Sequence, residues 1–240
     1  MNKFLVLSLL CIGLQASVYS QKTNTGWLAS FNTITISKKF SLHADIQFRS
    51  GDDFNTMQSL LLRPGLNYKI SSRVTATAGY AYILNRRSID EITGYAPEHR
   101  TWQQLLVSQS AGPLAISHRV RMEQRFISKT VVDGDELKQD GNIYANRFRY
   151  FFRGVLPFNG SVPFTKGVFA AVQDEIFLNV GNNSAVNGRS FDQNRAYLAL
   201  GYRLSRRLDL EGGYLNQYIQ GRGDSFTNNH VIQLAVYTRF

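Results

Sequence analysis

Arginine and glutamate side chains recur at every second position in several segments of the chain. In residues 118–126, for example, they alternate with apolar residues. A guanidinium group is a flat fork of N–H donors that fits carboxylates and phosphates, so a surface lined by arginines can bind anions or pair with its own carboxylates. The residues that we expect to share this chemistry are Arg49, Arg100, Arg119, Arg121, Glu123, Arg125, Arg147, Arg149, Glu175 and Arg195.

A catalytic centre is the rival chemistry. Ser41, His43 and Asp45 fall at alternate positions and therefore on one face of an extended strand. Such neighbours stand roughly 7 Å apart along the strand, whereas a catalytic triad needs side chains within about 3 Å of one another. We therefore assign no catalytic residue, and keep an outer-membrane lipid-modifying enzyme, a hydrolase or acyltransferase, as the alternative function.

The sequence gives no indication of a metal or a cofactor. Its four histidines are scattered without the spacing of a metal site. Its one cysteine, Cys11, falls in a segment that we expect to be removed. We assign no metal ligands and no cofactor.

β-Strands must position the charged residues, because alternation of apolar and polar residues has the two-residue period of a strand. In residues 40–49, for example, the apolar side chains occupy one face and the polar ones the other. The alternation predicts strands at residues 27–36, 40–49, 58–70, 74–84, 100–110, 114–126, 143–156, 164–180, 189–204, 208–218 and 229–240.

The connections between these strands alternate in length. Short ones fall at 37–39, 71–72, 111–113, 157–163 and 205–207, and long polar ones at 50–56, 85–98, 129–142, 181–188 and 219–228. Outer-membrane barrels have short periplasmic turns and longer external loops, and single-chain bacterial barrels have an even number of strands. We therefore predict an all-β fold in which residues 21–240 form one antiparallel transmembrane β-barrel of about 12 strands, with ten as the lower limit.

Both ends of the chain predict export to the outer membrane. Lys3 precedes an apolar run over residues 4–14, which is too short to span a bilayer and is typical of a signal peptide at residues 1–20. The last strand ends on Phe240 and resembles the signal that barrel-insertion machinery reads. We expect contact with outer-membrane lipids, and aromatic girdles at the headgroups formed by Trp27, Tyr80, Tyr82, Trp102, Tyr150, Tyr202, Tyr214 and Phe240.

The formal net charge of +10 suggests nucleic acid as a possible partner. Nucleic-acid-binding proteins gather their basic residues on an exposed face. Here the arginines instead alternate with apolar residues along strands of an exported chain. We therefore exclude nucleic acid as a partner and retain small anionic solutes.

Several spaced stretches also resemble a known family. Residues 98–104, 118–126, 146–150, 175–179 and 194–195 are similar, in this order, to DUF2490, a family of uncharacterised bacterial outer-membrane proteins. The resemblance covers nearly all of the chain after residue 20 and implies a barrel in the envelope of a Gram-negative bacterium. A mature chain that starts at Gln21 is similar to exports of Bacteroidetes. The resemblance implies no activity.

Two functions remain open for a lumen lined by these arginines. Small barrels fill their interior with side chains, so the first is an arginine–carboxylate network that stiffens a structural barrel. Rings of arginine select for anions, so the second is a narrow, porin-like channel that prefers small anionic solutes.

Overall fold

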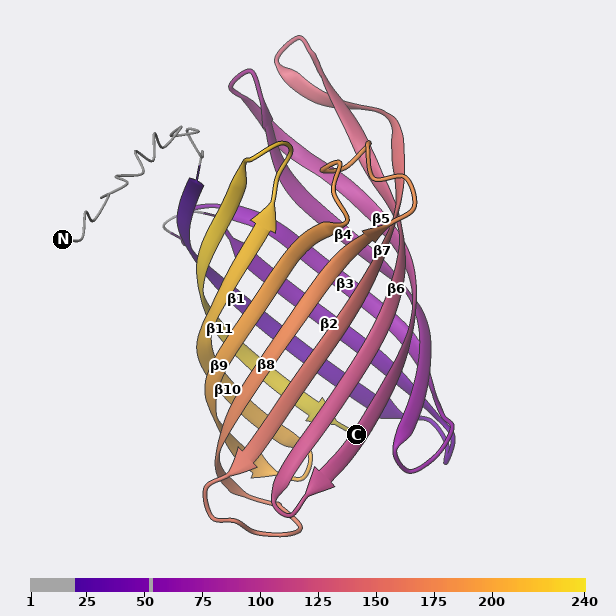
Figure 1. Cartoon of the computed structure of the whole chain (residues 1–240), viewed down its shortest axis with the longest axis vertical. Coiled ribbons are helices and arrows are strands. Elements are labelled where there is room, and N and C mark those ends of the chain that lie inside the picture. The colour runs from indigo at the N-terminus through magenta and orange to yellow at the C-terminus, as the bar shows by residue number, and fades with distance from the viewer. Residues whose placement is uncertain (1–19, 52–53) are drawn as a thin grey trace, which may run out of the picture.

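The computed structural model describes residues 20–51 and 54–240, and the strands of these residues form one closed barrel (Figure 1). The predicted signal peptide, residues 1–20, lies outside the described part of the chain except for its last residue. Within the described ranges, no helix is long and apolar enough to cross a membrane. The strands are β1 (Ser20–Thr35), β2 (Phe40–Ser50), β3 (Met57–Lys69), β4 (Val74–Ile89), β5 (Ile92–Ala111), β6 (Leu114–Asp133), β7 (Glu136–Pro157), β8 (Gly167–Val180), β9 (Phe191–Ser205), β10 (Leu208–Gln220) and β11 (Phe226–Arg239).

The barrel closes through a parallel pair. Strands that follow one another in the chain pair antiparallel, but β1 and β11 run in the same direction, from Ser20 opposite Phe226 to Thr33 opposite Arg239. An odd number of strands joined by hairpins requires this, because the first and last strands then point the same way. The described residues thus form eleven strands, which corrects our expectation of about 12 from the even-number rule.

The two ends of the barrel differ in their connections. One end, which we call the turn end, carries mostly tight turns, while the other, the hairpin end, carries the β4–β5 and β6–β7 hairpins that project furthest at the top of Figure 1. The predicted loops at 85–98 and 129–142 are wrong, because both segments continue the ladder. Asp90 and Glu91 make the β4–β5 turn with φ of 49° and 69°, the left-handed conformation that a two-residue hairpin turn needs.

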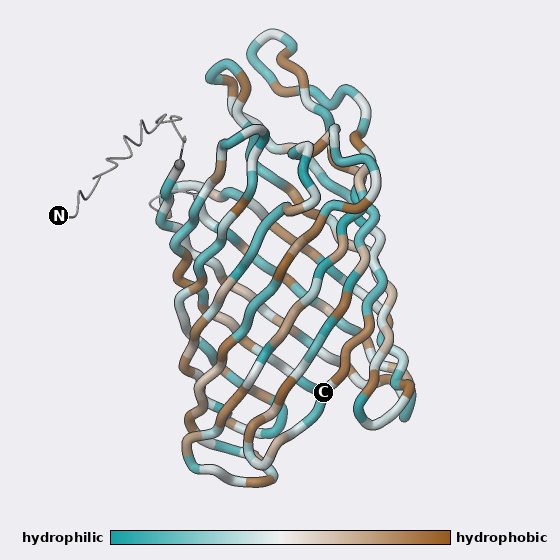
Figure 2. Tube along the Cα trace, viewed as in Figure 1, coloured by the Kyte–Doolittle hydropathy of each residue, from teal (hydrophilic) through white to brown (hydrophobic). Residues whose placement is uncertain are grey.

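The strands alternate between an apolar outer wall and a mixed lumen, and Figure 2 shows this alternation of brown and teal along them. Leu198, Leu200 and Leu234 are 62%, 60% and 55% exposed on the outside. Two predicted members of the aromatic girdle are wrong, because Trp27 and Trp102 are 6% and 1% exposed and lie in the lumen. Exposed side chains from the same prediction are Tyr80, Tyr150, Tyr202, Tyr214 and Phe240.

Glycines on the inner wall make room for the buried Trp102 ring. Gly79 lies opposite Trp102 in the β4–β5 ladder, and Gly65 lies opposite Gly79 in the β3–β4 ladder. A Cβ atom on Gly79 would lie 2.6 Å from the indole, and one on Gly65 would lie 2.8 Å from it. The indole therefore lies against the bare backbone, together with Leu61, Ala81 and Ile83. A second apolar cluster, which includes Trp27 and Phe169, lines the β8–β11 side.

Candidate anion site in the barrel lumen

Glu123 on β6 is the centre of the charged part of the lumen. Its carboxylate is 1% exposed and accepts hydrogen bonds from Arg147 Nη2 at 2.7 Å and Arg149 Nη1 at 2.5 Å, both on β7. Arg100 Nη1 on β5 lies 3.5 Å away, and Arg121 Nη1, on the same strand as Glu123, lies 3.8 Å away. The ladder explains the grouping, since it sets Glu123 opposite Arg147 and Arg121 opposite Arg149. One carboxylate thus forms ion pairs with four guanidinium groups.

Two further carboxylates extend this network. Glu98 Oε1 lies 2.6 Å from Arg100 Nε and 2.7 Å from Arg125 Nε. Glu175 Oε1 lies 2.7 Å from both Arg149 Nη2 and Arg119 Nη2. Eight of the ten predicted site residues are therefore joined in one ion-pair network, namely Arg100, Arg119, Arg121, Glu123, Arg125, Arg147, Arg149 and Glu175.

Sequence reasoning missed two acidic members of the network. Glu98 falls in the segment that we predicted to be a loop, although it lies two residues before Arg100 and so on the same strand face. Asp192, at the start of β9, lies 2.8 Å from Arg147 Nη1. It sits beside a register shift in the β8–β9 ladder, and no alternation pattern indicates the direction of a side chain there.

Arg49 and Arg195 stand apart from the network. Their guanidinium carbons lie 4.0 Å and 5.0 Å from the centre of the Trp27 ring, close enough for cation–π contact. Arg49 Nη2 donates to Gln47 Oε1 at 2.6 Å, and Arg195 Nη2 donates to Gln193 Oε1 at 3.3 Å. Neither guanidinium forms an ion pair within the described part of the chain, and Arg195 Nε there has no hydrogen-bond partner. Arg49 and Arg195, the two predicted site residues without an ion pair to a described carboxylate, thus both lie against Trp27.

Three cavities lined by described residues follow one another along the lumen. The upper cavity, of about 690 Å³, lies at the hairpin end. The middle cavity is about 390 Å³, and the lower one, at the turn end, is about 220 Å³. The middle and lower cavities share several residues, such as Arg153 and Tyr237, but Trp27 alone lines both the upper and the middle ones. The upper and the middle cavities therefore adjoin at Trp27.

Arginine outnumbers the carboxylates around each cavity. The middle cavity is lined by Arg63, Arg119, Arg149, Arg153, Arg195 and Arg239 against Asp45 and Glu175. The lower one has Arg153, Arg203 and Arg239 against Asp209. The upper one has Arg49, Arg86 and Arg87, and the described residues contribute no carboxylate to it. The chemistry that this arrangement favours is the attraction of anions into the lumen.

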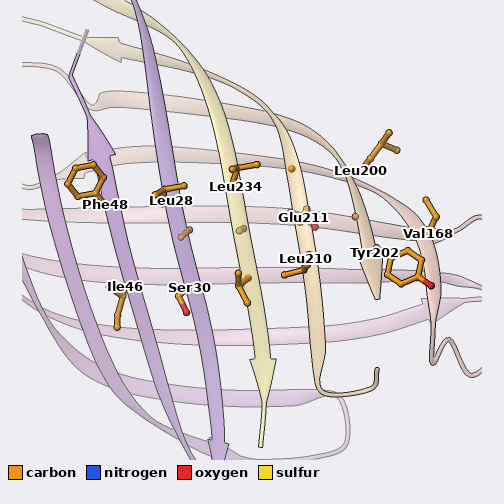
Figure 3. A pocket seen from close by; sticks show the side chains of 15 residues that line it. Leu28, Ser30, Ile46, Phe48, Val168, Leu200, Tyr202, Leu210, Glu211 and Leu234 are labelled. Carbon is orange, nitrogen blue, oxygen red and sulfur yellow. The ribbon is translucent and has the colours of Figure 1, made fainter. Parts of the chain in front are cut away.

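A larger hollow, of about 800 Å³, lies on the outer wall across β1, β2 and β8–β11 (Figure 3). Outward side chains such as Leu28, Leu200 and Leu234 line it. Its one acidic residue, Glu211, is 4% exposed and pairs with Arg153 in the lumen. This hollow is an apolar depression of the wall and has no charged group to do chemistry.

The residues weighed for an enzyme do not form a catalytic set. Asp45 pairs with Arg63 at 3.0 Å. The Ser41 hydroxyl accepts from Asn67 at 3.1 Å, and the His43 ring contacts Trp102 edge-on. No hydrogen bond joins Ser41, His43 and Asp45 to one another, so nothing in the described residues supports the lipid-modifying enzyme.

Comparisons with known proteins identify a family for the chain. An uncharacterized protein of Methylorubrum extorquens is 24% identical over 243 residues, which cover 98% of this chain and 97% of that protein. No solved structure matches the chain. The model of one family, described as a protein of unknown function (DUF2490), matches residues 24–228. The match spans most of the eleven strands that build the lumen, and the chain belongs to the DUF2490 family.

Proposed function

We propose that this barrel lies in the outer membrane of a Gram-negative bacterium. The support is the outer wall, whose exposed side chains are largely apolar over β1–β3 and β8–β11, as the lipid-facing band of a barrel must be. The predicted signal peptide and Phe240, which directly follows β11, also support export and contact with the insertion machinery. In this orientation the turn end faces the periplasm and the hairpin end faces outward.

We further infer that the lumen is a narrow channel that prefers anions. The observation that carries this inference is the excess of arginine around all three cavities, with Arg49 and Arg195 left without carboxylates. A network that served stiffness alone would balance its charges, because an uncompensated buried charge destabilises a protein. Solute anions supply the missing negative charge when they enter.

The test is conductance of the refolded mature protein in a planar bilayer under a salt gradient. We expect small discrete openings and a reversal potential that indicates anion preference. Trp27→Ala removes the large side chain at which the upper and middle cavities adjoin and should raise the conductance, while Arg49→Glu should reduce the anion preference. Trp102→Ala is the matched control, since Trp102 packs on the wall and lines none of the three cavities. Cation preference in the native protein would contradict the inference.

A structural barrel is the second candidate, and the Glu123 network favours it. Charged groups that pair with each other across three strands fill part of the interior and hold the wall in shape. Heat-modifiable gel mobility shows whether the protein is folded. If both the native protein and Trp27→Ala are folded by this criterion and neither conducts, the result would support this second function and exclude the channel.

A further inference from the structure

The upper cavity differs from the two below it in its charged groups, since the described residues give it arginines and no carboxylate. Side-chain amides of Gln58, Asn85, Gln217 and Asn229 and hydroxyls of Thr25 and Thr227 line it together with the three arginines. Amides and hydroxyls both donate and accept hydrogen bonds, so they match the hydroxyl groups of a sugar or polyol. The cavity therefore combines a surface for hydroxyl groups with a surface for negative charge.

We propose that the upper cavity is a binding site for a polyhydroxylated organic anion, a sugar phosphate or a sugar acid. The arginines hold the phosphate or carboxylate group, since a guanidinium binds these groups through two parallel hydrogen bonds. The amides and hydroxyls hold the remaining hydroxyl groups. This inference rests on the proposed function in one respect, since it names the solute class that the channel would take up from the hairpin end.

A buried hydroxyl without a partner independently points to a ligand. Thr25 is 7% exposed, yet its Oγ1 atom has no hydrogen-bond partner among the described residues. A buried hydroxyl that makes no hydrogen bond destabilises the fold, and Thr25 lines the upper cavity. A hydroxyl group of the bound solute would supply the missing partner.

The arginines of the cavity come from the two strands that flank β3. Arg49 lies on β2 and stacks on Trp27, whereas Arg86 and Arg87 lie on the part of β4 that extends beyond its ladder with β3. None of the three forms an ion pair with a carboxylate of the described residues. The cavity volume of about 690 Å³ falls within the range of roughly 300–1,000 Å³ typical of small-molecule sites.

Trp27 borders the cavity and can report on binding. The chain has two tryptophans, so Trp102→Phe leaves Trp27 as the sole indole. The refolded variant is titrated with glucose 6-phosphate, gluconate, inorganic phosphate and glucose while Trp27 fluorescence is recorded. We expect saturable changes with the first two, at concentrations about 10-fold below those for phosphate or glucose, because only they engage both surfaces. Calorimetric titration of the native chain repeats the comparison without the substitution.

Substitutions separate the two surfaces. Arg49→Gln and Arg87→Gln should each weaken glucose 6-phosphate binding about 10-fold, which corresponds to the loss of one charge-assisted hydrogen bond. Thr25→Val should weaken glucose 6-phosphate binding and leave phosphate binding unchanged. Arg73→Gln is the matched control, since Arg73 is an exposed arginine at the turn end.

The outcomes distinguish this inference from the proposed channel. If glucose 6-phosphate and gluconate bind no more tightly than inorganic phosphate, or if Arg73→Gln weakens binding as much as Arg87→Gln, the inference is wrong, whatever the conductance shows. If both bind tightly and the bilayer stays silent, the site stands and the channel is excluded. Tight binding together with anion-selective openings supports both.

Discussion

Replacing Glu123 by glutamine should destabilise the barrel more than any other single charge removal in the lumen. The substitution keeps the size of the side chain and removes the charge that faces Arg100, Arg121, Arg147 and Arg149. The hydrogen bonds at 2.5 and 2.7 Å end on different oxygens, and glutamine has only one, so its NH2 group would face one of the two guanidinium donors. Breaking a buried pair by neutralising one partner costs about 3–5 kcal/mol, and four affected arginines place the expected loss at the upper part of that range.

The assay is equilibrium unfolding of the refolded barrel by guanidinium chloride, followed by tryptophan fluorescence. Glu136→Gln is the control, since Glu136 is exposed at the tip of the β6–β7 hairpin, where such changes alter the free energy of unfolding by about 0.5 kcal/mol or less. In an Arg147→Met background the Glu123→Gln penalty should shrink, because one uncompensated charge is gone. A loss below about 1 kcal/mol for Glu123→Gln, or an unchanged penalty in that background, would refute the central role of this carboxylate.

Two further predictions concern the wall. Gly79→Ala should cost about 1–3 kcal/mol of unfolding free energy through overpacking, because its Cβ would lie 2.6 Å from the Trp102 ring, whereas Gly154→Ala should cost little because its nearest contact would be at 3.5 Å. Urea unfolding of both variants checks this. Leu198→Arg on the outer wall should cost about 2–4 kcal/mol in a lipid bilayer, against about 0–1 kcal/mol for Val131→Arg on the projecting hairpin. Equal penalties in vesicle unfolding would contradict the membrane setting.

The inward direction of the charged residues could be predicted from the sequence because it depends on a local rule. Alternate side chains of a strand point to opposite faces, so Arg119, Arg121, Glu123 and Arg125 had to share one wall of β6. The pairing of Glu123 with Arg147 depends instead on the β6–β7 register. The turn lies inside the segment that we predicted as a long loop, and the ladder shifts register between Ser128 and Thr130, so the partners could not be derived from alternation alone.

The two tryptophans show where residue type misleads. Aromatic residues near strand ends are typical of membrane interfaces, and we placed Trp27 and Trp102 there for that reason. The alternation already contradicted this, since Trp102 lies two residues after Arg100 and so on the lumen face. Strand period should therefore outweigh residue preference in such a barrel. Packing of the indole on Gly65 and Gly79 involves neighbouring strands and could not be seen in the sequence of one strand.

In the strand count the error was of another kind, because we gave a general rule about bacterial barrels more weight than the pattern of the residues. The alternation predicted eleven segments, and they correspond in order to β1–β11. The twelfth strand was added only to satisfy the even number of bacterial barrels. Closure of a barrel requires only that no strand edge is left unpaired, which does not demand an even number of strands. The parallel ladder of β1 with β11 pairs the last two edges over fourteen residue pairs.

Stiffening and anion passage need not compete in this lumen, because part of the ion-pair network lies away from the cavities. The carboxylates that hold most of the arginines, Glu98 and Glu123, line none of the three cavities. The upper and middle cavities meet at Trp27, against which Arg49 and Arg195 lie. The ion pairs of Glu98 and Glu123 hold the barrel wall in shape without lining these cavities. Changes at Glu123 should therefore act mainly on the free energy of unfolding, and changes at Arg49 mainly on ion preference and ligand affinity.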